Sequence, residues 1–268
     1  MDQGIGKIVA EIKSQGRLDN TLILFLQDNG GCAEGYGRYK PGKPYPTSYK
    51  PFGRDQLQTK IWPPMQTRDG RPLRVGPGVM AGPEDTFIAY GRGWANVSNT
   101  PFREYKHFSH EGGVSTPLIA HWPEGISKDR IGKLERQPGH LIDLMATLVD
   151  VSGATYPRQV GKQEITPMEG VSLRPAFAGK ALNRKEALYF EHHLNSAIRE
   201  GDWKLVRTGY PGRNARVNPW ELYDISKDRT ELNNLAKKHP EKVTELKKKW
   251  ESWAQRVKVK PWPWKIKE

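Results

Sequence analysis

The chain has 268 residues with a hydrophobic content of 36%, 27 glycines, 21 prolines and a mean hydropathy of −0.75. These values are typical of long loops around a modest core. The sequence contains no run of about 18 apolar residues, which a membrane-spanning helix would need. The single cysteine, Cys32, excludes an internal disulfide and a cysteine-rich metal site.

The positive charge is concentrated near the C-terminus. The formal net charge is +13, and residues 237–268 hold eleven lysines or arginines against four glutamates, a net +7. A lysine-rich helix face is usually solvated surface, and no helix-turn-helix or aromatic stacking pattern accompanies it. We therefore expect no nucleic-acid partner.

The first predicted element is a helix that Asp2 could cap and that Gly16 ends. Its apolar residues recur at helical spacing, and they are Ile5, Ile8, Val9 and Ile12. The first 16 residues contain no apolar signal region, so we expect no export signal in the chain as written.

A strand is predicted next, because residues 22–26 are all apolar and do not alternate with polar residues. Such a run is typical of a strand buried on both faces of a parallel α/β sheet. Gly30 and Gly31 end the strand and leave Asp28 and Asn29 at its carboxyl end, where such sheets gather ligands. Their oxygens suit a hard cation such as Ca²⁺ or Mg²⁺, although the same two residues could merely turn the chain.

Residues from about 32 to 85 are rich in Gly, Pro, Tyr and basic residues and lack periodicity. A loop this long inside a compact domain is usually functional, so we predict a substrate-facing insertion. A second buried strand is predicted over residues 117–123, followed by a helix that ends at Gly153. One face of that helix carries Leu141, Leu144, Met145 and Leu148.

From about residue 179 the pattern changes to short strands followed by a helix. Residues 187–191, 196–207 and 220–224 are predicted to form an antiparallel sheet. Pro240 starts the last helix, whose apolar stripe is predicted to pack on that sheet. We therefore expect a domain boundary between residues 178 and 179.

Basic side chains precede a glycine turn in the middle of the chain. Lys106, His107 and His110 lie just before the Glu-Gly-Gly sequence at 111–113. Lysine can hold sulfate or phosphate, and histidine can donate a proton to a leaving group near neutral pH. The same residues could instead be ordinary solvated side chains of a loop.

Four segments, in this order, closely resemble the C-terminal half of the type I sulfatases, the arylsulfatase branch of the alkaline-phosphatase superfamily. They are TLILFLQDNGG, YKHFSHEGGVSTPLIAHWPEGI, PGHLIDLMATLVDVSGATYP and WELYDISKDRTELNNLA. The resemblance implies that residues 1–178 are the distal part of an alkaline-phosphatase-like α/β sheet domain. It implies that residues 179–268 are a small C-terminal antiparallel sheet with a packed helix.

The resemblance also implies site residues. In that family a Ca²⁺ ion held by three Asp and one Asn positions the sulfate ester, and Asp28 and Asn29 match one Asp-Asn pair. With half of the ligands, the chain is expected to hold Ca²⁺ weakly or not at all. The sulfate-binding lysine matches Lys106, with His110 a weaker candidate for sulfate contact or proton donation. His192 or His193 could contact the substrate from the C-terminal sheet.

The chain departs from the family at the nucleophile. The family uses a formylglycine made from Cys or Ser in a Cys/Ser-x-Pro/Ala-x-Arg motif, and a motif that began at Cys32 would have Tyr36 at its fifth place instead of Arg. The other Asp ligands and the signal peptide of the family correspond to positions before Met1, which we therefore expect to be an internal start. The chain alone is expected to be inactive and to need an N-terminal half as partner.

The function implied by the resemblance is hydrolysis of a sulfate ester, for which a sulfated glycan is one candidate substrate. One alternative is a non-catalytic remnant that binds sulfated or anionic glycans through Lys106 and the basic surface. Another is a phosphatase or phosphonate-ester hydrolase of the same superfamily. Full-length members of the family are usually exported, periplasmic or secreted.

Overall fold

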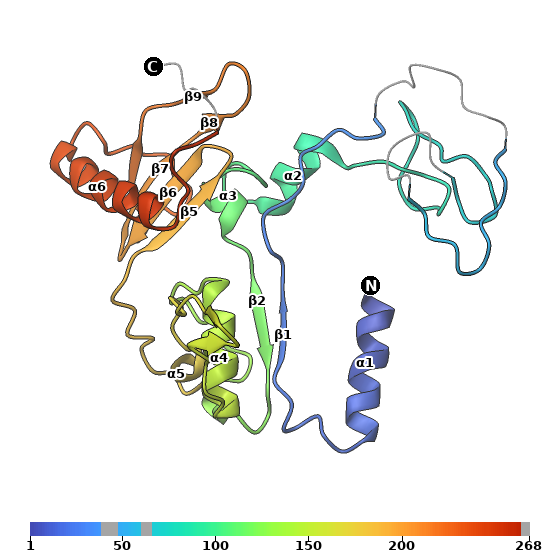
Figure 1. The fold of residues 1–268 in the computed structure, drawn as a ribbon, viewed down its shortest axis with the longest axis horizontal. Coiled ribbons are helices and arrows are strands. Elements are labelled where there is room, and N and C mark those ends of the chain that lie inside the picture. The colour runs from blue at the N-terminus through green and yellow to red at the C-terminus, as the bar shows by residue number, and fades with distance from the viewer. Residues whose placement is uncertain (39–47, 60–65, 264–268) are drawn as a thin grey trace. The chain divides into compact units, whose positions relative to one another are not determined.

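The computed structural model describes residues 1–38, 48–59 and 66–263, which form two compact units (Figure 1). The first unit contains residues 1–28, 116–188 and 199–201, and the second contains 29–115, 189–198 and the chain from 202 onward. No helix in these described ranges is long and apolar enough to cross a membrane. The domain boundary expected between residues 178 and 179 stays a prediction.

The first unit begins with a helix and a pair of strands. Helix α1 spans Asp2–Ser14, as predicted, with Asp2 in its first turn rather than at the cap, and Gly16 follows with a positive φ of 65°. Strands β1 (Ile23–Leu26) and β2 (Leu118–His121) lie side by side and pair antiparallel, with Leu24 opposite Ala120 (Figure 1).

The prediction of a buried parallel sheet is wrong for these two strands. Strand β1 is only half-buried, and Ile119 of β2 is 60% exposed. In the described residues no third strand joins the pair, and although Leu22 and Ala120 pack against the core of this unit, no residue of β1 is fully buried. The run of apolar residues correctly indicated a strand. Whether its partner runs parallel or antiparallel depends on how the connecting chain brings β2 back beside it, which residue type does not indicate.

Helix α4 (Ile142–Ser152) ends at Gly153, which adopts the left-handed conformation with φ 67°, as predicted. On the face predicted to carry leucines, Leu141, Met145 and Leu148 are each about half exposed, and only Leu144 packs against the core. The buried residues are Asp143, Ala146 and Thr147.

Hydrogen bonds explain which face of α4 turns inward. Asp143 Oδ1 accepts from the backbone N–H of Val171 at 2.9 Å, and Thr147 Oγ1 accepts from that of Leu173 at 2.9 Å. Two polar side chains thus satisfy the backbone of the following segment, which ends in the short helix α5 (Arg174–Phe177). The core of this unit is built from Leu173, Phe177 and Leu182, against which Leu144 packs.

Small elements complete the first unit. They are the 3₁₀ turn η1 (Lys128–Arg130) and the hairpin of β3 (Gln159–Val160) and β4 (Gln163–Glu164).

The second unit contains the predicted C-terminal sheet. Its four strands, in the spatial order β10-β7-β6-β5, are β5 (Leu188–His192), β6 (Asn195–Glu200), β7 (Trp203–Arg207) and β10 (Glu221–Asp224). A small hairpin pairs β8 (Gly209–Tyr210) with β9 (Arg216–Val217). Helix α6 (Pro240–Arg256) packs on the sheet as predicted, because Trp250 Nε1 donates to the carbonyl oxygen of Phe190 at 3.1 Å (Figure 1).

The rest of the second unit is mostly irregular. Helix α2 (Gly91–Asn99) follows the long segment predicted as an insertion, in which the described residues form only two isolated bridges, Gln66 with Pro72 and Arg74 with Thr86. Residues 39–47 and 60–65 of that segment lie outside the described residues. Its substrate-facing role stays a prediction. The Glu-Gly-Gly sequence forms a single helical turn, α3 (Glu111–Val114), instead of a simple glycine turn.

Candidate functional site

Gly30 and Gly31, near the start of the second unit, lie against the loop that carries Lys106. The backbone N–H of Gly30 donates to the carbonyl oxygen of Gly113 at 3.0 Å, and Lys106 N–H donates to that of Gly31 at 3.1 Å. A Cβ atom on Gly30 would lie 1.8 Å from the carbonyl oxygen of Gly112. Only glycine allows this approach, so these residues do more than end the strand.

Asp28 and Asn29 follow β1 directly, with Asp28 exposed and Asn29 half-buried. Their carboxylate and amide oxygens suit Ca²⁺, which takes about six to eight oxygen ligands. The pair therefore fits part of a calcium site in donor type but supplies few of the ligands. Its metal role stays a prediction.

The carboxylate of Glu34 contacts Lys106 and two other polar side chains. Its Oε1 lies 3.3 Å from Lys106 Nζ and 3.0 Å from His107 Nε2, and its Oε2 accepts from the thiol of Cys32. Burial alone would raise the pKa of Glu34, but these hydrogen bonds outweigh it and lower the pKa to about 2. Glu34 is therefore ionised at neutral pH beside the lysine predicted to contact sulfate.

The surroundings of Cys32 do not favour a thiolate. Burial raises the pKa of Cys32, and the hydrogen bond to Glu34 raises it further. A protonated thiol is a poor nucleophile, and Cys32 also lacks the motif from which formylglycine is made, so Cys32 fits neither kind of nucleophile.

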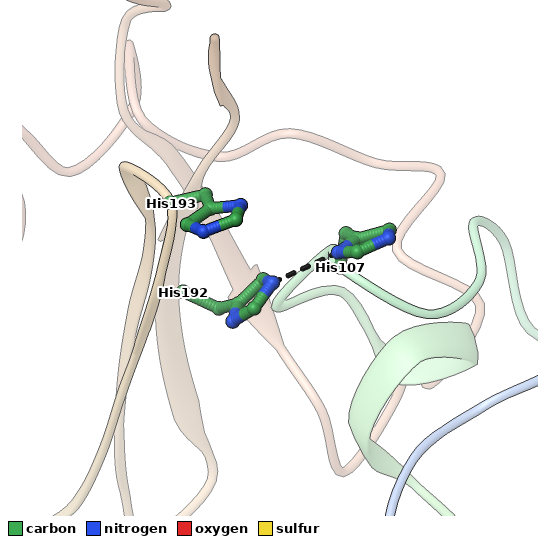
Figure 2. Close-up of side chains that lie close together, drawn as sticks. All are labelled: His107, His192 and His193. Carbon is green, nitrogen blue, oxygen red and sulfur yellow. Dashed lines mark hydrogen bonds between the residues drawn. The ribbon is translucent and has the colours of Figure 1, made fainter. Parts of the chain in front are cut away.

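Three histidines from distant parts of the sequence meet in the second unit. Figure 2 shows His107, from the loop before α3, facing His192 and His193 at the end of β5. His107 Nδ1 lies 2.8 Å from His192 Nε2, and the rings of His192 and His193 stack with centroids 4.3 Å apart. One ring nitrogen from each residue lies within 4.8 Å of those of the other two.

Charge and burial act together on His192. Burial lowers its pKa, and the electrostatic influence of His193, His107 and Lys106 lowers it further. His192 is therefore held in its neutral form to lower pH than an ordinary histidine. The direct substrate contacts predicted for His192 and His193 stay predictions.

The backbone of this histidine cluster, His107, His192 and His193, is unusual. His107 has φ 85°, His193 has φ 49° and the next residue, Leu194, has φ 73°. His193 and Leu194 are the two residues between β5 and β6, at positions where tight hairpins prefer Asn-Gly. Neither residue is glycine, so the left-handed conformation costs free energy at both.

His110 is placed differently from its prediction as a sulfate contact or proton donor. Its side chain is fully buried, with Nε2 3.3 Å from Glu221 Oε2. The same carboxylate accepts from the hydroxyl of Tyr223. A side chain without exposed surface does not reach a substrate in this conformation, so the geometry supports a structural role for His110.

Glu34 and the meeting of the three histidines are features that sequence reasoning missed. Glu34 lies in an irregular stretch with no periodic signal, two residues after Cys32. His107 and His192 are 85 residues apart, and no spacing in the sequence indicates that they are neighbours.

Comparison with known proteins matches most of the chain to sulfatases. The family model Sulfatase matches residues 1–154, and the model described as N-sulphoglucosamine sulphohydrolase, C-terminal, matches residues 104–258. The chain is 30% identical over 253 residues to an uncharacterised sulfatase of Schizosaccharomyces pombe, covering 93% of this chain and 40% of that protein. It is 31% identical over 193 residues to an arylsulfatase of Klebsiella aerogenes, covering 70% of this chain and 35% of that protein.

A solved structure of a protein in complex with its substrate, D-glucosamine-2-N,6-O-disulfate, is similar with a TM-score of 0.55 and 17% identity. The match includes 97% of this chain and 39% of the solved one. This likeness supports the alkaline-phosphatase-like fold. The chain spans about 40% of the length of the Schizosaccharomyces pombe sulfatase. Because the Sulfatase model matches more than half of its residues, the chain belongs to the sulfatase family.

Proposed function

We propose that the chain supplies the C-terminal part of a sulfuric ester hydrolase, which converts a sulfate ester to an alcohol and sulfate. Family membership supports the reaction class. The observation that carries the proposal is the backbone hydrogen bond of 3.1 Å from Lys106 to Gly31, two residues after Asn29. This bond holds the backbone of Lys106, the proposed sulfate contact, beside the segment that follows Asn29, a proposed metal ligand.

In this proposal the Lys106 ammonium stabilises negative charge on the sulfate oxygens. In the chain as described that ammonium lies beside the ionised Glu34 at 3.3 Å. A sulfate oxygen would have to compete with this carboxylate or share the lysine with it. Lys106 Nζ has three hydrogens, so one can remain directed at Glu34 while another meets the substrate.

Calcium dependence is typical of the sulfatase family. Asp28 and Asn29 would hold the ion together with ligands from the rest of the enzyme, and the ion would neutralise charge on the sulfate. The nucleophile would likewise come from outside this chain, since Cys32 lacks the family motif. The 268-residue chain alone is therefore expected to hydrolyse no sulfate ester.

A sulfated sugar is the substrate class that we propose. A protein with the same fold has a disulfated glucosamine as its substrate. The excess positive charge of this chain would attract such an anion from solution. The same charge supports the second candidate, a non-catalytic chain that binds sulfated or anionic glycans.

The test uses the complete reading frame that contains this chain, expressed together with a formylglycine-generating enzyme and assayed with 4-nitrophenyl sulfate. Lys106→Ala should lower kcat/KM by about 100-fold to 1,000-fold, because one charged group that stabilises the transition state is lost. Lys227→Ala removes the same charge from an exposed ion pair and should leave kcat/KM unchanged.

Two outcomes would contradict the sulfatase reaction, and a third would contradict the proposal that the nucleophile lies outside this chain. A reading frame without an upstream Cys/Ser-x-Pro/Ala-x-Arg motif would favour the glycan-binding chain. Hydrolysis of 4-nitrophenyl phosphate with no hydrolysis of the sulfate would favour a phosphatase. Sulfatase activity of the 268-residue chain alone, abolished by Cys32→Ala, would show that Cys32 is the nucleophile after all.

A further inference from the structure

We propose that His107, His192 and His193 bind a transition-metal ion of the zinc class. The cluster offers three imidazole nitrogens, all within 4.8 Å of one another (Figure 2). Imidazole is a good ligand for Zn²⁺, Cu²⁺ and Ni²⁺, whereas Ca²⁺ prefers oxygen. The proposed ion is therefore different in kind from the calcium expected at Asp28 and Asn29, and the proposal does not depend on sulfatase activity.

The positions of the nitrogens are close to what zinc needs. Zn–N bonds of about 2.0–2.1 Å in a tetrahedral site separate the ligand nitrogens by about 3.3–3.5 Å. His107 Nδ1 and His192 Nε2 are now 2.8 Å apart, so a small rotation of either ring makes room for an ion. His192 and His193 are exposed and the side chain of His107 is 40% exposed, so both the ion and the rotation are accessible.

Glu34 orients one of the three ligands. Its Oε1 lies 3.0 Å from His107 Nε2, which makes Nε2 the protonated nitrogen and leaves Nδ1 as the lone pair that faces His192. A carboxylate that accepts the second N–H of a ligand histidine is the usual support of such a ligand at zinc sites. The negative charge of Glu34 also offsets the nearby charge of Lys106, which would otherwise repel a cation.

The backbone conformation points to a ligand as well. His107 and His193 both have positive φ values, of 85° and 49°. Non-glycine residues held in this conformation cluster at ligand clamps, where an added interaction offsets the cost. The His193-Leu194 turn lacks the Asn-Gly pair that would form it readily, so local propensity does not account for the turn. A metal bond to His193 would stabilise it.

The test measures binding of Zn²⁺ to the full 268-residue chain by calorimetry and of Co²⁺ by its visible absorption. We expect one ion per chain and a Co²⁺ spectrum typical of nitrogen ligands, with no competition from Ca²⁺. His107→Asn and His193→Asn should each weaken Zn²⁺ binding by more than about 10-fold, because each removes a ligand. Asparagine tolerates the left-handed conformation, so both variants keep the backbone.

His121→Asn on β2 is the matched control, since it removes an exposed histidine outside the cluster. Its Zn²⁺ affinity should equal that of the wild type, and equal thermal unfolding in metal-free buffer should show that all variants are folded. Equal Zn²⁺ affinity of all the variants, or no Zn²⁺ binding by the folded wild type, would overturn the proposal. So would a cluster that binds inorganic sulfate but not Zn²⁺, because the histidines would then contact the anion directly.

Discussion

The ammonium of Lys204 lies 2.8 Å from Oε1 of Glu111, and both side chains are almost fully buried. Lys204 belongs to the central strand β7, and Glu111 begins α3. Oε1 of a second buried carboxylate, Glu231, lies 2.9 Å from the same ammonium, while its Oε2 accepts from the backbone N–H of Glu111 at 2.7 Å. The Glu-Gly-Gly turn beside the candidate site is therefore fixed to the C-terminal sheet by a buried ion network.

Lys204→Met is expected to destabilise the chain by about 3–5 kcal/mol, because it leaves two buried carboxylates without their shared cation. Urea unfolding followed by tryptophan fluorescence measures the loss. Lys227→Met is the control, since Lys227 is 81% exposed in its pair with Asp224 and the substitution should leave the stability almost unchanged. Equal losses in the two variants would show that the network contributes no more than a surface pair.

Gly30→Ala is expected to destabilise the second unit by about 1–3 kcal/mol or more, because the added Cβ would meet the carbonyl oxygen of Gly112 at 1.8 Å. Backbone atoms cannot move aside as a flexible side chain can. Gly93→Ala, in the exposed part of α2 with no atom within 4 Å of its Cβ, should instead be neutral or stabilise by up to about 1 kcal/mol. Thermal unfolding distinguishes them, and an unchanged Tm for Gly30→Ala would show that the two loops are not in contact.

Local patterns in the sequence predicted most helices and strands, because they depend on neighbouring residues. The boundaries of α1, α4 and α6 agree with helical spacing and with Gly16, Gly153 and Pro240. The burial of Asp143 and Thr147 in α4 was not predicted, because it depends on their hydrogen bonds to a later segment. Such long-range bonds leave no periodic pattern in the sequence.

The sequence predicted a residue of the candidate site only where that residue belongs to a short motif. Lys106 was found because it precedes Glu-Gly-Gly at a fixed spacing. Its partner Glu34 lies 72 positions earlier in an irregular stretch, and Lys204 lies in a strand where a lysine would ordinarily be expected to face solvent. Both contacts depend on how distant segments pack, which the residue types alone do not indicate.

His140 should make the stability of the first unit depend on pH. Burial lowers its pKa, although the charge of Asp143 opposes this, and its Nδ1 accepts from the backbone N–H of Ile142 at 3.2 Å. Between its lowered pKa and about pH 6.5 the folded state holds fewer protons than the unfolded state, so stability is full above about pH 6.5 and is lost as the pH falls to the lowered pKa of His140.

His140→Asn removes the proton but keeps an acceptor close to the position of Nδ1. Urea unfolding of the wild type should show a loss of stability as the pH falls below the usual pKa of histidine, about 6.5, and this loss should be smaller in the variant. His121→Asn, which changes an exposed histidine of the same unit, should retain the full loss. Identical pH profiles for His140→Asn and the wild type would assign the dependence to other groups.

Glu34→Gln is expected to lower the Zn²⁺ affinity of the histidine cluster by about 10-fold to 100-fold while leaving one ion per chain. The glutamine can still accept a hydrogen bond from His107 Nε2, but it no longer supplies the charge that offsets Lys106 and that makes His107 a stronger ligand. Competition with a coloured chelator measures the affinity. Glu84→Gln removes the same charge from an exposed carboxylate that pairs with Arg71 in the same unit, so it should change the affinity by less than about twofold. If both variants lost affinity equally, the effect would come from net charge at long range, and Glu34 would have no specific role in orienting His107.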